Sequence, residues 1–261
     1  MSVLVAVGNT PLVELKRIVP AGAARVLAKL EYANPTGSMK DRMALAAINA
    51  AERDGRLPAG GTVVEYTGGT TGVSLAFIGA AKGYRSHMIF SDAFSPDKGL
   101  MMEALGSHVS RVPGRGRGIT ERLIKDMIET AKQLSDQPGH WWCDQLNNTD
   151  ALQGYIPLGE EIWRQSGATV NAFVHAVGTA HSLHGATLGL WRHDPTIHIA
   201  AVEPEESAVL SGGLSGSHSI DGIGIGFIPP LWEPDHVHEI LAVSTPQARA
   251  MARRLASEEG I

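Results

Sequence analysis

Short apolar runs alternate with segments of helical periodicity along most of this chain. The runs that predict strands cover 26–31, 62–66, 86–91, 108–112, 141–143, 172–177 and 197–203. The segments between them predict helices at 38–55, 71–82, 96–105, within 120–134, within 151–165, and at 182–191. Alternation of this kind is typical of parallel sheets that helices cover on both faces. The sequence therefore predicts an α/β fold of the doubly wound type.

Length and charge narrow the class of protein further. The 261 residues can form one large or two ordinary domains, and no linker, repeat or low-complexity segment marks a boundary. The net charge of −5 argues against a surface for nucleic acid or anionic membranes, and the basic stretch at 111–118 is expected to be a solvated loop. Since neither a leader nor a membrane span is recognisable, a cytoplasmic protein is expected.

Cysteine and histidine usage gives no sign of a disulfide or a metal site. The single cysteine, Cys143, lies beside two tryptophans in an apolar run and is expected to be a buried structural thiol. Among eleven histidines, His236 and His238 would share a face if that stretch is extended, but nothing completes a ligand set. We therefore predict no metal. The chain also lacks a G-x-S-x-G elbow and a Walker A string.

One lysine stands at a predicted helix start, in the stretch NPTGSMKDRMA at 34–44. Turn residues precede Ser38, which is predicted to be the N-cap, and Asp41 favours the positive end of the helix dipole. Lys40 flanks a predicted buried stripe formed by Met39, Met43, Ala47, Ile48 and Ala51. Burial and the helix start would both lower the pKa of its amine, as in Schiff-base lysines. A solvated helix lysine fits the same spacing, so the residues alone leave both interpretations open.

The segment NPTGSMKDR resembles the cofactor-lysine motif of the cysteine synthase (O-acetylserine sulfhydrylase-like) family. The members of this family are pyridoxal-phosphate (PLP) enzymes of fold type II. Other segments follow in the family's order: VGNTPLVEL at 7–15, VEYTGGTTG at 64–72, AVGTAHSLHG at 176–185, VEPEESAVLSGG at 202–213 and GIGIGFIPPL at 222–231. The match covers nearly the whole chain. It implies two doubly wound parallel-sheet domains, as in tryptophan synthase β, with the active site in the cleft between them. By this resemblance the smaller domain is 38–147, and the larger one comprises 1–37 and 148–261.

The same resemblance assigns residues to the cofactor. Lys40 would hold PLP, and the loop after the strand at 172–177 would bind the phosphate through amides at a helix N-terminus. The family pattern there is GTGGT, whereas this chain has Ala180 and His181 in place of two glycines. A side chain is unfavourable at either position if the backbone needs a positive φ, although His181 could instead donate to the phosphate. The implied cofactor-binding residues are Lys40, Thr70, Gly178, Thr179, Ala180, His181, Ser182 and Gly222.

A second loop, TGGTTG at 67–72, resembles the family's substrate loop TSGNTG. The asparagine that touches the ring hydroxyl of the cofactor is replaced by Thr70, and the serine is replaced by Gly68. Gln145 resembles the glutamine that the family lends to the substrate carboxylate, although a glutamine in this context is by itself typical of a polar surface. The implied substrate-binding residues are Thr67, Gly68, Gly69, Thr71 and Gln145.

The resemblance implies a lyase or transferase of cysteine biosynthesis. It would act on an O-activated serine by β-elimination and β-replacement with sulfide or another thiol, as a homodimer with an amino-acid substrate. Two alternatives stay open: a serine/threonine dehydratase-type PLP enzyme, and a catalytically impaired binding or partner protein of the PLP family. Relatives continue past ARRLASEEGI with a G-x-S-S-G motif, whose serine bonds the pyridine nitrogen. The sequence stops at Ile261, so the larger domain is expected to be incomplete at that end.

Overall fold

A computed structural model describes residues 1–114 and 120–261, and these divide into two compact units. Unit 1 comprises Met1–Gly8 and Tyr32–Gly154, and unit 2 comprises Asn9–Glu31 and Tyr155–Ile261. Of the predicted loop at 111–118, residues 115–118 lie outside the described part of the chain.

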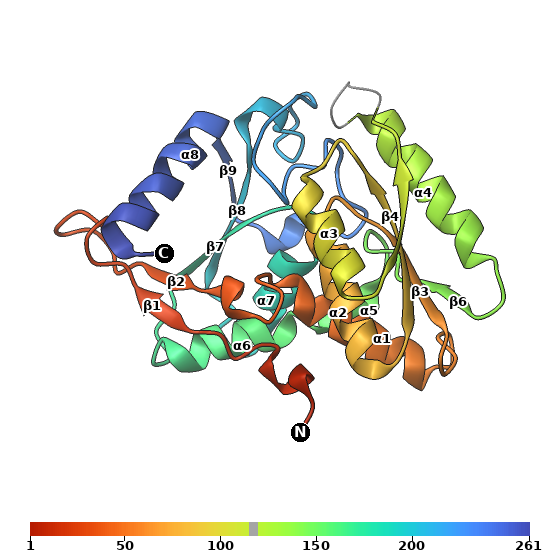
Figure 1. The fold of residues 1–261 in the computed structure, drawn as a ribbon. Helices are drawn as coiled ribbons and strands as arrows, with labels where there is room; N and C mark the ends of the chain where they lie inside the picture. The colour runs from red at the N-terminus through yellow and green to blue at the C-terminus, as the bar shows by residue number, and fades with distance from the viewer. Residues whose placement is uncertain (115–119) are drawn as a thin grey trace. The chain divides into compact units, whose positions relative to one another are not determined.

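Unit 1 is built on a four-stranded parallel sheet of order β5-β4-β3-β6. Helix α4 lies on one side of this sheet, and α1, α2 and α3 lie on the other (Figure 1). Its strands are β3 (Thr62–Tyr66), β4 (Arg85–Ser91), β5 (His108–Val112) and β6 (His140–Trp142). Its helices are α1 (Lys40–Arg53), α2 (Thr70–Lys82), α3 (Pro96–Ala104), α4 (Glu121–Ser135) and α5 (Thr149–Gln153), with a 3₁₀ turn η1 (Val3–Ala6).

The core of unit 1 lies where α1 and the central strand bury their apolar residues. All five residues of β3 are buried, as expected for a strand covered on both faces. In α1, four members of the predicted stripe, Met43, Ala47, Ile48 and Ala51, are at most 1% exposed. Met39, the fifth, is half-buried because it precedes the helix. Helical periodicity in the sequence therefore located the face that fixes α1.

Unit 2 holds a three-stranded parallel sheet of order β7-β8-β9 and an antiparallel pair, β1-β2. Helices α6 and α7 pack closely enough that a Cβ added at Gly189 would lie 3.0 Å from Cα of Gly159. The strands are β1 (Leu12–Glu14), β2 (Leu27–Lys29), β7 (Ala172–Ala176), β8 (His198–Pro204) and β9 (Glu239–Val243). The helices are α6 (Ile156–Gln165), α7 (His181–Trp191) and α8 (Thr245–Arg254). Short turns lie at Glu205–Ser207, Pro234–His236 and Leu255–Glu259. A further turn, Glu31–Ala33, begins at the last residue of the segment Asn9–Glu31 and continues into unit 1.

The parallel sheets confirm the predicted α/β class, and several boundaries differ from expectation. A helix does lie within 151–165, namely α6, but the first residues of that range belong to the separate short helix α5, which ends at Gln153. Gly154 lies directly against the backbone carbonyl of Arg42, and Pro157 falls in the first turn of α6, where proline is favoured. Strand β2 falls within the predicted strand at 26–31, whereas its partner β1, strand β9 and helix α8 were not predicted. No helix in the described part of the chain is long and apolar enough to cross a membrane.

A buried ion pair fastens β2 to α6 within unit 2. Nζ of Lys29 lies 2.7 Å from Oε2 of Glu161, and it also donates to the carbonyl of Thr10 and to Oε1 of Gln165. The two charged side chains are 9% and 10% exposed. Lys29→Met leaves the Glu161 carboxylate buried without its cation, so we expect it to lower the free energy of unfolding by about 3–5 kcal/mol. Urea denaturation followed by circular dichroism measures this.

The matched control is Arg25→Met in the same segment. Arg25 pairs with Glu14 at 2.9 Å, but these side chains are 54% and 39% exposed. Water screens such a pair, so its loss is expected to cost less than about 1 kcal/mol. Similar losses in the two variants would contradict a role for the buried pair.

Candidate functional site

Lys40 is the first residue of α1, and hydrogen bonds fix the turn that precedes it. The Asp41 carboxylate accepts from the backbone N–H of Thr36 at 2.9 Å and from its hydroxyl at 2.6 Å. Oγ of Ser38 accepts from the N–H of Lys40 at 3.2 Å. Ser38 was predicted to be the N-cap, but Met39 occupies that position and the helix begins one residue later. Ser38 still satisfies one of the orphan amides of the first turn.

The Lys40 amine is partly removed from water and has no compensating charge. The residue is half-buried, and within the described part of unit 1 its Nζ has no hydrogen-bond or ion-pair partner. Desolvation lowers the pKa of this amine from 10.5 to about 8. A substantial fraction of the Lys40 amine is therefore neutral at mildly alkaline pH. This favours the reactive interpretation of Lys40 over a fully solvated helix lysine.

The predicted substrate loop, 67–72, joins β3 to α2 and leaves amides free at the helix start. Oγ1 of Thr67 accepts from the N–H groups of Gly69 at 2.9 Å and of Gly72 at 3.1 Å, which closes the turn. In the described structure, the amides of Thr70 and Thr71 have no acceptor. Free amides at the positive end of a helix dipole suit a carboxylate.

Gln145 belongs to the same cluster in unit 1 and is not a surface residue. It is 8% exposed, and its Oε1 accepts from the hydroxyl of Thr71 at 2.8 Å. Its Nε2 donates to the carbonyl of Tyr66, also at 2.8 Å. The structure thus brings Gln145 to the loop that contains Thr67, Gly68, Gly69 and Thr71.

Two residues of the β4–α3 region cover this loop, and sequence reasoning missed both. A Cβ added at Gly68 would lie 2.9 Å from Cε1 of Phe94, and one added at Gly69 would lie 2.9 Å from Cγ of Lys98. Gly69 also has a φ of 150°, which side chains rarely adopt. A serine at position 68, as in the family pattern, would therefore require Phe94 to move. No local signal in the sequence marks these neighbours.

In unit 2 the predicted phosphate loop joins β7 to α7. Ala180 takes a φ of 69°, so the residue that replaces a family glycine does occupy the left-handed region. Nδ1 of His181 lies 2.9 Å from Oγ1 of Thr179, and Oγ of Ser182 lies 2.8 Å from Nε2 of His175. The amides of Thr179, Ala180 and Ser182 have no acceptor among the residues described. This set of free amides fits a phosphate group.

Gly178 and Gly222 lie together although 44 positions separate them (222 − 178). A Cβ added at Gly178 would lie 2.6 Å from the carbonyl oxygen of Gly222, so only glycine fits there without movement. The N–H of Gly224 donates to the carbonyl of Val177 at 3.0 Å. The glycine run at 222–226 is therefore fixed against the start of the phosphate loop.

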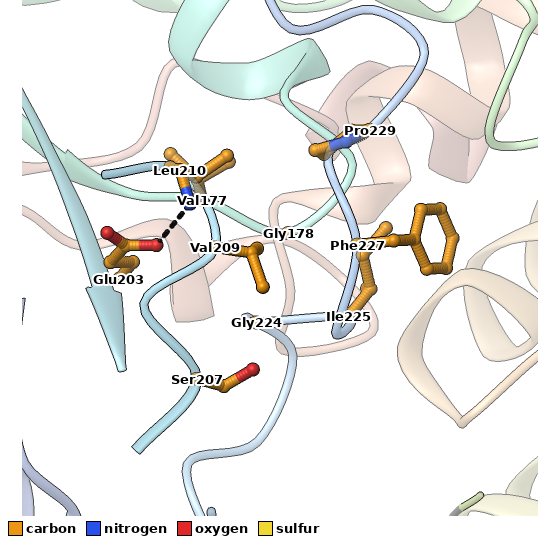
Figure 2. A pocket seen from close by; sticks show the side chains of 10 residues that line it. All are labelled: Val177, Gly178, Glu203, Ser207, Val209, Leu210, Gly224, Ile225, Phe227 and Pro229. Atoms are coloured by element: carbon orange, nitrogen blue, oxygen red, sulfur yellow. Dashed lines mark hydrogen bonds between the residues drawn. The ribbon is translucent and has the colours of Figure 1, made fainter. Parts of the chain in front are cut away.

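A small cavity lies beside this loop within unit 2 (Figure 2). Gly178, Ser207, Gly224 and Phe227 help to line it, and Glu203 holds the neighbouring segment by accepting from the N–H of Leu210 at 2.7 Å. Its volume is about 10 Å³, which holds one water molecule. The cavity is too small for an amino acid or a cofactor, so the candidate anion site of unit 2 is the loop itself and not this cavity.

The remaining predictions about reactive groups have clear outcomes. Cys143 is buried, and burial raises the pKa of its thiol, as expected for a structural cysteine. His236 lies in a 3₁₀ turn and packs against the ring of His184, so the extended arrangement considered for His236 and His238 does not occur. Among the described residues, no group of three or more potential ligands is arranged to hold a metal ion.

Comparison with known proteins identifies the family. The model for "Pyridoxal-phosphate dependent enzyme" matches residues 3–261. The chain belongs to this family. PLP is therefore its cofactor. Taken one by one, the amine of Lys40 suits an aldehyde, and the amides of Thr179, Ala180 and Ser182 suit a phosphate.

Relatives within the family agree in sequence and in structure. A cysteine synthase of Staphylococcus aureus is 40% identical over 257 residues, which are 98% of this chain and 81% of the relative. The crystal structure of a cysteine synthase (OASS) from Entamoeba histolytica matches with a TM-score of 0.92 at 36% identity, over 99% of this chain and 77% of that one. O-ureido-L-serine synthase also matches with a TM-score of 0.92, at 32% identity, over 100% of this chain and 81% of that one.

The lowered pKa of Lys40 can be measured directly in the cofactor-free protein. Reductive methylation with ¹³C-formaldehyde gives each lysine a signal whose shift follows its ionisation. We expect the Lys40 signal, assigned by its absence in Lys40→Ala, to titrate near pH 8, the amine being charged below and neutral above. A midpoint near 10.5 for this signal would contradict desolvation of the amine.

The strained conformation of Ala180 makes a second prediction. Ala180→Gly removes a Cβ from a residue at φ 69°, so we expect the free energy of unfolding to rise by about 1 kcal/mol. Ala168→Gly is the control, because Ala168 has a φ of 59° on an exposed turn away from the loop. Both variants should be stabilised in thermal unfolding, but only Ala180→Gly should change the dissociation constant for PLP. A destabilised Ala180→Gly variant would count against strain at this position.

Proposed function

We propose that this protein is a cysteine synthase-like enzyme of the O-acetylserine sulfhydrylase type. It would replace the leaving group on the β-carbon of an O-activated serine with sulfide or another thiol. The observation that carries the proposal is the desolvated amine of Lys40, at the position of the family's cofactor lysine. The cysteine synthases among its relatives support the choice of reaction.

The family resemblance assigns PLP contacts to Lys40 and Thr70 in unit 1 and, separately, to the loop before α7 in unit 2. Lys40 would hold the aldehyde carbon of PLP covalently, and the hydroxyl of Thr70 would contact the ring. The free amides at the start of α7 support the loop as a phosphate site, because they have no other acceptor in the described structure. The residues proposed for this loop and the segment against it are Gly178, Thr179, Ala180, His181, Ser182 and Gly222.

The proposed substrate site is the loop between β3 and α2. A carboxylate there would accept from the free amides of Thr70 and Thr71, and from the one N–H of the Gln145 amide that the protein leaves unused. Thr67 would hold the turn in shape through its two accepted hydrogen bonds. Gly68 and Gly69 would form the rest of the loop that faces the substrate.

When bound, PLP supplies an electron sink for the bond that breaks at the α-carbon. Lys40 would also act as the base that takes the α-proton, through the neutral form of its amine. A base acts best when its pKa lies near the working pH, and a value of about 8 meets this condition. The half-buried setting of Lys40 would leave a substantial fraction of that amine neutral at mildly alkaline pH.

The second candidate function is β-replacement with a nucleophile other than sulfide. The altered substrate loop supports this candidate. Gly68 under Phe94, together with Thr70, replaces two polar side chains of the family pattern. O-ureido-L-serine synthase is among the structural relatives. Assays of O-acetyl-L-serine with sulfide, with other nucleophiles and with none separate these activities, because keto acid released without a nucleophile marks a dehydratase.

We also propose the larger-scale features that the family resemblance implies. The protein would be a cytoplasmic homodimer with a smaller domain at 38–147 and a larger one at 1–37 and 148–261. The compact unit at 32–154 supports a division of this kind. Sedimentation equilibrium of the purified holoenzyme tests the dimer.

Lys40→Ala tests the central proposal. The wild-type protein is expected to be yellow with PLP and to form cysteine from O-acetyl-L-serine and sulfide, and the variant to lose turnover by at least about a thousandfold. Borohydride reduction followed by peptide mapping should place the label on Lys40. Lys82→Ala is the control, because Lys82 pairs with Glu52 and stands outside the site. An unchanged colour and rate in Lys40→Ala would exclude the proposed role.

A further inference from the structure

A buried carboxylate lies directly behind the proposed substrate loop. Glu65 is the fourth residue of β3 and is 0% exposed. Its Oε1 accepts from the backbone N–H of Tyr66 at 3.0 Å and from the indole N–H of Trp142 at 3.2 Å. Its Oε2 accepts from the backbone N–H of Gln145 at 2.9 Å. Three donors therefore converge on a group that only accepts when it is ionised.

The bond to Gln145 links Glu65 to the substrate loop. The Gln145 amide has only one possible orientation, because the Tyr66 carbonyl can accept but not donate and must face Nε2. Oε1 of Gln145 is then presented to the hydroxyl of Thr71 at the start of α2. A chain of hydrogen bonds thus runs from Glu65 through Gln145 to Thr71. It connects the end of β3, the turn after β6 and the first turn of α2.

Burial makes ionisation of the Glu65 side chain costly, so this side chain would be a poor choice if its only role were to fill the core. Desolvation raises the pKa of Glu65 to about 8, the N–H bonds from Gln145, Trp142 and Tyr66 oppose the rise, and the nearby Asp144 carboxylate adds to it. An apolar side chain would avoid this cost but would leave the buried N–H of Gln145 without an acceptor. A carboxyl side chain keeps an acceptor oxygen for this N–H whether or not it is ionised, so it matches the need to hold the Gln145 backbone.

We propose that Glu65 is a positioning residue for the amino-acid carboxylate, which acts by fixing the backbone of Gln145 and thereby the Gln145 amide and the Thr71 hydroxyl. The inference rests on the proposed function, because it assigns Gln145 and Thr71 to the substrate. Glu65 touches neither substrate nor cofactor. It governs binding of the amino acid and leaves the Lys40 linkage unaffected.

Glu65→Gln tests this with little change in volume. One acceptor oxygen becomes an NH₂ group, which must face either the N–H of Gln145 or the N–H groups of Trp142 and Tyr66. We expect KM for O-acetyl-L-serine to rise about tenfold or more, with kcat within about threefold of wild type and one PLP per chain retained. A visible-absorbance titration with L-serine should show the same loss of affinity.

Trp142→Phe is the matched control. It removes the indole donor to Oε1 but leaves the bond from Oε2 to the Gln145 backbone. We expect KM to stay within about twofold of wild type. Equal rises in KM for Trp142→Phe and Glu65→Gln would show that the effect comes from loosening this region in general, and would overturn the proposal.

A double-mutant cycle with Gln145→Ala separates positioning from a purely structural role. If Glu65 acts through the Gln145 side chain, Glu65→Gln should add less than about twofold to KM once that side chain is gone. Multiplicative effects would overturn the inference. If Glu65→Gln does not fold, Glu65→Asp takes its place in the cycle, because its shorter side chain also withdraws from the Gln145 N–H.

Failure of the inference and failure of the proposed function give different results. A wild-type protein that binds PLP through Lys40 and turns over, combined with an unchanged KM in Glu65→Gln, overturns only the role of Glu65. A wild-type protein that takes up PLP but shows no saturable response to amino acids overturns the proposed function, and the positioning role with it.

Discussion

The proposed chemistry depends on an amine that is held partly out of water, with no anion beside it among the described residues of unit 1. Lys40 has a pKa of about 8 because desolvation lowers it and no neighbouring charge opposes that shift. That situation requires a rigid support, since a mobile lysine would turn its charge into solvent. The buried stripe of α1 and the bonds from Thr36 to the Asp41 carboxylate supply this support. Reactivity at Lys40 is thus a property of the whole first helix.

The loops at 67–72 and 178–182 each join a strand to a helix, and different interactions hold the two turns in shape. Each leaves backbone amides without an acceptor at a helix start, where an anion is favoured. In unit 1 the hydroxyl of Thr67 accepts from Gly69 and Gly72, and the next amides stay free. In unit 2 the turn is completed by Ala180 in the left-handed region, at the expense of backbone strain. The loop of unit 1 is therefore held by a side chain, whereas that of unit 2 is held by an unfavourable backbone conformation.

The substrate loop is also supported from beneath, through Glu65 and Gln145. This support belongs to unit 1 and does not involve the 178–182 loop. The residues proposed for the amino acid are therefore held by hydrogen bonds different from those that hold the loop proposed for the phosphate.

The sequence by itself determined the parallel α/β class, the bounds of β3 and β5, the helix that begins beside Lys40, and the glycine-rich loops. These follow from local periodicity and turn chemistry, which act over a few residues. It did not reveal the break at Gly154, because that depends on contact with Arg42. Nor did it reveal that Phe94 and Lys98 cover the substrate loop.

Only the tertiary structure decided the state of the functional groups. Glu65 and Gln145 meet across 80 positions of sequence, and Gly178 meets Gly222 across 44 (222 − 178). The pKa of Lys40 likewise depends on the atoms that exclude water from it. Burial and hydrogen bonding are set by neighbours that folding brings from distant segments, so they cannot be read from residues adjacent in the chain.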